Sequence, residues 1–259
     1  MTRSLVRMRL IAGNTFREAT RSRLLYNLLF FALLMIASSI SAAKINLGWN
    51  ERIYRDFGLS AIALFGTLIA IFVGIGLVYR EIAEKTVYTM LARPLHRWEF
   101  LLGKYAGLVA VLAVEVAVMA VCFLGMLALR SSPVTPGLVQ AIAMIGVELA
   151  LVTAVAIFFS SFTTPYLAGM CTVALWVIGH LLGDLRAFGQ HSEAEIVQRA
   201  TELLYWTLPN LDLLDFKSLA AEGRPIAASR VWLATGYAAL YSTGLLIASV
   251  ILFRRRDFR

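Results

Sequence analysis

Two glutamates in apolar surroundings are the side chains of this sequence best placed to do chemistry. Glu115 lies near the middle of the apolar run 105–129, and Glu148 near the middle of the run 138–159. An ionisable group at membrane depth is costly, so it faces the interior of a helix bundle or a water-filled cavity. We expect one of two roles: lining a translocation path, or serving as protonated, hydrogen-bonded structural groups.

A face of the same helix could bind a metal. Glu115 shares one narrow arc with Met119, Cys122 and Met126. Soft sulfur ligands suit Cu(I). Methionine and cysteine are also common packing residues in apolar helices, and that interpretation is the stronger one.

Other motifs of enzymes are missing. The sequence has no G-x-x-x-x-G-K-[ST] phosphate loop, because Trp98 stands at the first glycine position ahead of Gly103 and Lys104. The three histidines fit no zinc spacing, and His180 with Asp184, at i and i+4, predicts a local pair. We therefore expect a chain that is not an enzyme and holds no metal or cofactor. The rival interpretation, an intramembrane enzyme with one deep glutamate as acid or base, lacks a nucleophile.

The composition is that of an integral membrane protein. Of 259 residues, 59% are hydrophobic and 15% charged, and the mean hydropathy is +0.75. Apolar runs of about 18 or more residues are typical of membrane spans. The sequence predicts an all-α membrane domain over 1–259 with six transmembrane helices, at 24–43, 59–79, 105–129, 138–159, 166–183 and 231–253.

The segment 3–23, ahead of the first run, predicts an amphipathic helix on an anionic leaflet. Its apolar arc is too regular for the alternative, a disordered basic tail. One arc holds Leu5, Met8, Ala12, Phe16 and Ala19, and the opposite arc holds Arg3, Arg7, Arg17 and Arg21.

Basic residues predict the orientation. With the N-terminus inside, fifteen of the 24 Lys and Arg residues fall on cytoplasmic segments. Both termini are then cytoplasmic, and the net charge of +8 belongs to these membrane faces rather than to a nucleic-acid surface.

The segment 184–230 is the only sizeable outer region. Ser192 followed by Glu195 is a capping-box pattern that predicts a helix over 193–206. After it, LPNLDLLDF at 208–216 alternates acids with apolar residues, as expected of a segment that dips into the headgroups.

Small residues predict close helix packing. Gly103 and Gly107 form a G-x-x-x-G pattern, and Gly74 and Gly76 form a second small patch. The pattern fits packing within the chain or between two copies, and the sequence does not choose.

An amphipathic stretch, 80–104, lies between the second and third runs. Pro94 ends its helix. Such a helix rests on the bilayer or presses against a soluble partner. One arc holds Ala83, Val87, Met90 and Leu91, and the other Glu81, Lys85 and Tyr88.

These segments together resemble an ABC-2-type transporter permease, closest to the branch linked to maturation of multicopper enzymes such as nitrous oxide reductase. The stretches that carry the resemblance are NTFREATRSRLLY at 14–26, the long motif at 55–107, LPNLDLLDF at 208–216 and FRRRDF at 253–258.

The resemblance implies a permease homodimer in a bacterial cytoplasmic membrane, joined to two copies of a separate ABC ATPase that bind ATP and Mg. The segment 80–98 then resembles the coupling helix seated on that ATPase, although Lys85 stands where many relatives have glycine. The ATPase-coupling residues would be Glu81, Glu84, Thr86, Tyr88, Pro94 and Arg97, with Gly103 and Lys104 also at motif positions.

The function implied is that of the membrane subunit of an exporter. The alternative is an ATPase-driven scaffold that assists maturation of periplasmic metalloproteins through 184–230 without bulk transport. The cargo cannot be inferred from the sequence.

Overall fold

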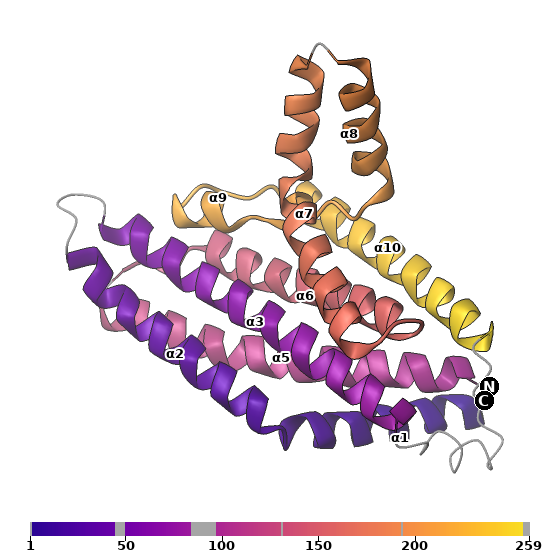
Figure 1. Ribbon diagram of the computed structural model, residues 1–259. Coiled ribbons are helices and arrows are strands. Elements are labelled where there is room, and N and C mark those ends of the chain that lie inside the picture. Colours follow the sequence, from indigo (N-terminus) through magenta and orange to yellow (C-terminus); the bar gives the residue numbers. More distant parts are fainter. Residues whose placement is uncertain (1, 45–49, 84–96, 131, 193, 256–259) are drawn as a thin grey trace.

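The protein is a bundle of helices (Figure 1), and its computed structural model describes residues 2–44, 50–83, 97–130, 132–192 and 194–255. Over these ranges the regular structure is helical and no strand occurs, so the all-α prediction is confirmed. The elements are α1 (Thr2–Thr20), α2 (Arg23–Lys44), α3 (Asn50–Ala83), α5 (Arg97–Leu129), α6 (Pro136–Ser160), α7 (Pro165–His191), α8 (Glu195–Thr207), the 3-10 turn η1 (Asp212–Leu214), α9 (Lys217–Ala221) and α10 (Ala228–Arg255).

Among the described residues, five helices are long and apolar enough to cross a membrane: α3, α5, α6, α7 and α10. Helices α1 and α2 pass the same test only as a pair bent by 63°, and counting that pair as one span would give six crossings. The chain is therefore a multi-pass membrane protein. The prediction that α2 alone crosses while α1 lies in the interface stays a prediction.

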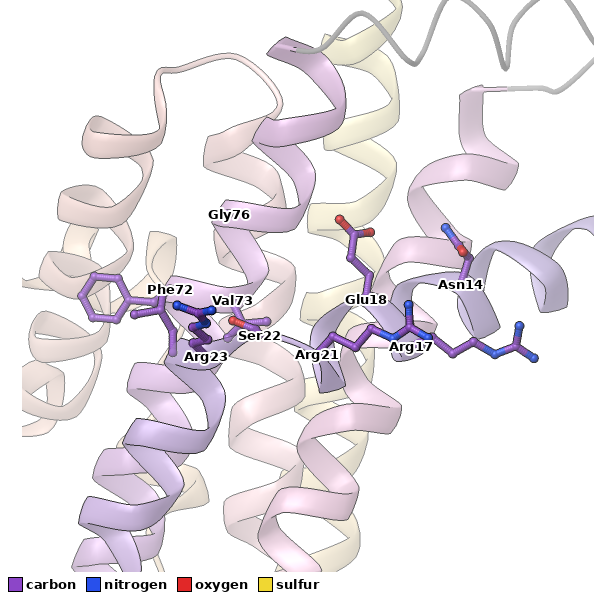
Figure 2. Close-up of a pocket in the computed structure, with 10 residues that line it drawn as sticks. Asn14, Arg17, Glu18, Arg21, Ser22, Arg23, Phe72, Val73 and Gly76 are labelled. Carbon is purple, nitrogen blue, oxygen red and sulfur yellow. The ribbon is translucent and has the colours of Figure 1, made fainter.

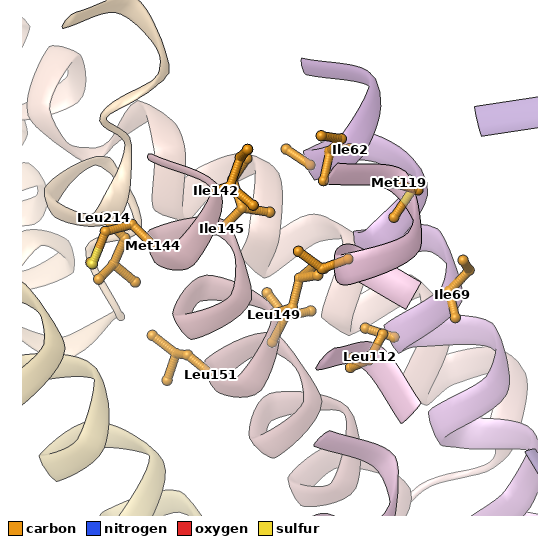
Figure 3. Close-up of a cluster of buried hydrophobic side chains, with 14 of the residues drawn as sticks. Ile62, Ile69, Leu112, Met119, Ile142, Met144, Ile145, Leu149, Leu151 and Leu214 are labelled. Atoms are coloured by element: carbon orange, nitrogen blue, oxygen red, sulfur yellow. The ribbon is translucent and has the colours of Figure 1, made fainter. Parts of the chain in front are cut away.

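Helix α6 is the centre of the bundle. It packs against α3, α5, α7 and α10, and Figure 3 shows its side chains between those of α3 and α5 on one flank and Leu214 on the other. It is apolar around its whole circumference, as expected of a fully enclosed helix. Gly66 of α3 permits the close approach, because an added Cβ would lie 2.6 Å from Leu149 Cδ1.

Helix α7 is longer than the span predicted within it. The sequence predicts a span over 166–183, and α7 continues without a break to His191 and forms a hairpin with α8 that projects from the bundle (Figure 1). Gly189 lets α8 approach, since an added Cβ would collide with Thr201. Arg186 also lies over the ring of Tyr205, 4.3 Å from its centroid.

The helix predicted over 193–206 is confirmed as α8, but its predicted capping box is wrong. The N-cap is Ala194, which makes no side-chain cap bond. Ser192 instead lies two residues before the N-cap: its hydroxyl accepts a bond from the Ala194 amide, and its carbonyl accepts one from the Gln198 side chain.

The segment 208–216 packs against the helix bundle, and its predicted dip into the headgroup layer stays a prediction. Leu211, Leu214 and Phe216 are buried against the bundle. The Leu211 amide donates to the Gly179 carbonyl, and the Asn210 amide donates to the Tyr237 hydroxyl. The alternation of acids and apolar residues therefore marks a half-buried turn that packs on α7 and α10.

Candidate functional site

Glu148 lies on the face of α6 that meets α7. Its side chain is almost fully buried, and Oε1 accepts a hydrogen bond from Trp176 Nε1 at 3.1 Å. The same oxygen lies 3.3 Å from His180 Nε2. The sequence pairs His180 with Asp184, but the structure pairs it with Glu148 on the neighbouring helix, while Asp184 is exposed.

The contacts of His180 indicate which ring nitrogen carries hydrogen. His180 Nδ1 lies 3.0 Å from the carbonyl oxygen of Trp176, which can only accept, so Nδ1 carries hydrogen. Nε2 then faces the carboxyl oxygen of Glu148 at 3.3 Å. The close approach of these polar groups joins α6 to α7.

Glu115 has a different environment. It is 5% exposed on α5, and its Oε2 has no hydrogen-bond partner among the described residues. The buried hydroxyl of Thr67 on α3 likewise has none there. A charged carboxylate without a partner at this depth is far costlier than a protonated one, so Glu115 is best suited to the neutral form.

The two polar groups lie at one level of the bundle. An added Cβ at Gly58 would meet Phe123, and one at Gly74 would meet Leu108. These contacts set the register of the antiparallel helices α3 and α5. The same register places residue 67 opposite residue 115.

The residues of α5 that could bind a metal, on the arc from Glu115 to Met126, do not share one environment. Met119 is fully buried beside Glu115, whereas Cys122 is exposed. Within the ranges that the structure describes, no three His, Cys, Asp or Glu side chains are grouped as metal ligands.

The predicted coupling segment 80–98 joins two helices of the core. Glu81 lies in the last turn of α3, which ends at Ala83, and Arg97 is the first residue of α5. The other predicted coupling residues lie outside the described residues: Glu84, Thr86, Tyr88 and Pro94.

Helix α1 packs along the first turns of α5, the helix that follows the predicted coupling segment 80–98. The two glycines of the G-x-x-x-G pattern form the contact: an added Cβ at Gly103 would lie 2.8 Å from Ile11 Cβ, and one at Gly107 would lie 2.7 Å from the Ala12 carbonyl oxygen. The pattern therefore serves packing within the chain. Gly76, by contrast, has no atom of a neighbouring element within 4 Å of an added Cβ.

Charged side chains reinforce this α1–α5 contact. Lys104 is 1% exposed, and its Nζ lies 3.7 Å from Glu18 Oε2. One turn earlier, buried Glu99 lies 3.8 Å from Arg7. The sequence places Lys104 among the cytoplasmic charges and at a position of the coupling motif, and it does not predict this contact with Glu18. The available signal was Glu18, the single acid in the first 50 residues.

We expect Gly107→Leu to loosen α1 from α5. The new side chain would overlap the Ala12 carbonyl and Thr15, and overpacking of this kind costs about 1–3 kcal/mol. Thermal unfolding of the purified chain in detergent measures the loss. The matched control is Gly125→Leu on the same helix, where an added Cβ meets nothing within 4 Å. Equal losses in both variants would contradict the assigned contact.

A comparison with known protein families indicates which kind of membrane protein this bundle is. Residues 9–258 match the family described as ABC-2 family transporter protein. No curated protein matches the chain.

Proposed function

The chain belongs to the ABC-2 family of transporter proteins, and from this membership we propose that it is an exporter permease driven by a separate ABC ATPase. The observation that carries the proposal is the family match, which covers nearly the whole chain and all the apolar helices. In the proposed assembly, two copies of the chain join two ATPase subunits, which bind ATP and Mg. Both termini then lie in the cytoplasm, and the membrane is the bacterial cytoplasmic membrane.

We place the ATPase contact at 80–98. Two features of the described residues support this. The segment links α3 with α5, and both of these helices pack on the central helix α6. The start of α5 is also held by α1 through Gly103, Gly107 and the Lys104–Glu18 pair. A push on the segment would thus move α1, α3 and α5 together.

Reversing one charge in this segment tests the contact. We expect Glu84→Lys to abolish most of the stimulation of the ATPase by the permease, because a displaced contact gives the two nucleotide states no differential interaction with the membrane subunit. The measurement is ATP hydrolysis by the reconstituted complex. The control is Glu202→Lys, a reversal at an exposed position of α8, which packs on α7 and projects from the bundle (Figure 1).

Normal stimulation in Glu84→Lys, with the complex intact, would show that the segment only rests on lipid.

The direction of transport is tested separately. Complexes reconstituted into vesicles, with ATP supplied only on the ATPase side, should move cargo away from that side. Activity of the purified chain without any ATPase would overturn the proposal.

The positions of the two buried glutamates do not favour a direct role in transport. A path between two copies of the chain would run along surfaces that a single copy leaves open, whereas Glu115 and Glu148 are enclosed between helices of one chain. Their place on a translocation path stays a prediction. The contacts of Glu148 with Trp176 and His180 suit a structural role.

A second function, a scaffold for periplasmic partners, has one observation in its favour. Helix α8 has no buried residue, and it exposes Ile196, Leu203 and Trp206 by 68–84%. Exposed apolar patches of this kind are typical of interaction sites. Partner binding that depends on ATP but moves no cargo across vesicles would favour this function over export.

A further inference from the structure

A cavity of about 860 Å³ opens where α1 bends into α2. Figure 2 shows the residues that line it, which come from α1, from the start of α2 and from α3. The lining residues are Asn14, Arg17, Glu18, Arg21, Ser22, Arg23, Leu24, Phe72, Val73 and Gly76.

The polar side of the cavity carries excess positive charge. Arg17, Arg21 and Arg23 have no carboxylate partner among the described residues. Glu18 does not neutralise them, because its carboxylate lies 3.7 Å from the buried ammonium of Lys104. Three guanidinium groups are therefore available to an anion, and guanidinium matches phosphate geometry well.

The opposite side is apolar and lies at membrane depth. Phe72, Val73 and Gly76 belong to the part of α3 that is apolar enough to cross a bilayer. Phe72 is 54% exposed, and Leu24, on the first turn of α2, is 57% exposed. An occupant must therefore be anionic at one end and apolar at the other.

We propose that this cavity binds an anionic phospholipid from the leaflet in which α1 lies. The phosphate contacts Arg17, Arg21 and Arg23, and the upper acyl chains lie along Leu24 and Phe72. Basic pockets between membrane helices on one face of the bilayer are suited to such headgroups. A soluble anion would leave the apolar wall in contact with water, and a soluble protein would have to enter the hydrocarbon region to reach Phe72.

The lipid would be a structural ligand rather than cargo. It would join the bend at residues 21–22 to α3, and so complement the contact of α1 with α5. This inference does not depend on the direction of transport or on the ATPase, and it holds for the chain by itself.

The test measures lipid binding to the full-length chain in a neutral detergent by native mass spectrometry. The probes are phosphatidylglycerol, phosphatidylcholine with the same acyl chains, and soluble glycerol phosphate. The variants are Arg21→Ala and Arg23→Ala. Arg9→Ala is the matched control, because Arg9 is an exposed arginine of α1 that does not line the cavity.

We expect tight binding of phosphatidylglycerol, weaker binding of phosphatidylcholine and none of glycerol phosphate. Arg21→Ala and Arg23→Ala should each weaken phosphatidylglycerol binding about fivefold, and Arg9→Ala should leave it unchanged. All three side chains are exposed, so the thermal midpoint without lipid should stay at the parent value in each variant.

A second measurement tests whether the bound lipid lies within the cavity. In Phe72→Trp, a phosphatidylglycerol brominated on its acyl chains should quench the new tryptophan more than a brominated phosphatidylcholine does. Equal affinity for both lipids, equal weakening by Arg9→Ala, or equal quenching would show general attraction to the surface and overturn the proposal. Binding of glycerol phosphate as tight as that of the lipid would overturn the choice of occupant.

Discussion

Glu18→Lys is expected to lower the stability of the chain by about 3 kcal/mol or more. The substitution places a second ammonium beside Lys104, whose side chain is 1% exposed and whose Nζ lies 3.7 Å from the present carboxylate. A buried charge facing a like charge is among the costliest changes that a fold can undergo. Unfolding of the purified chain in mixed detergent micelles measures the loss.

The reciprocal substitution supplies the control. Lys104→Glu alone places two carboxylates together and should also destabilise, whereas the double variant Glu18→Lys/Lys104→Glu restores an opposite pair and should recover at least half of the loss. Non-additivity of this size is the signature of direct contact. A double variant as unstable as the sum of the two single ones would contradict the pairing of α1 with α5.

The membrane helices could be predicted from the sequence because each apolar run is itself the cause of the helix. In hydrocarbon every backbone group must bond within its own segment. The boundaries 138–159 and 231–253 accordingly fall within two or three residues of α6 and α10. The length of α7 could not be predicted from the apolar run 166–183, since α7 leaves the bundle as a helix and only its packing on α8 accounts for residues 184–191.

Contacts between helices were much harder to predict. His180 was assigned to Asp184, because spacing along one helix can be read from the sequence, while the rotation of α7 that turns His180 to Glu148 cannot. The contact of Lys104 with Glu18 on α1 could not be predicted for the same reason. The G-x-x-x-G pattern correctly indicated close packing, but only the structure shows that its partner is α1.

Glu148→Leu and Glu115→Leu form the second test, and only the first should lower the stability of the chain markedly. Leucine at 148 removes the acceptor of Trp176 Nε1 and the partner of His180. One interhelical hydrogen bond in a membrane protein contributes only about 0.6 kcal/mol. Leaving the half-buried indole N–H of Trp176 without an acceptor, and His180 without its carboxyl neighbour, costs more, and we expect a loss of about 1–3 kcal/mol, measured by unfolding in mixed micelles.

Glu115→Leu removes a buried carboxyl whose Oε2 bonds to nothing in the described parts of the chain. We expect its stability to stay within about 1 kcal/mol of the parent or to rise, because an apolar side chain of similar volume suits the site. Transport by the same variant then separates the two roles of Glu115. A stable but inactive Glu115→Leu complex would place this carboxyl on the working path, since loss of fold could not account for the loss of activity. A marked loss of stability would show instead that Glu115 has a partner in the assembled dimer, and unchanged transport would remove it from the functional site.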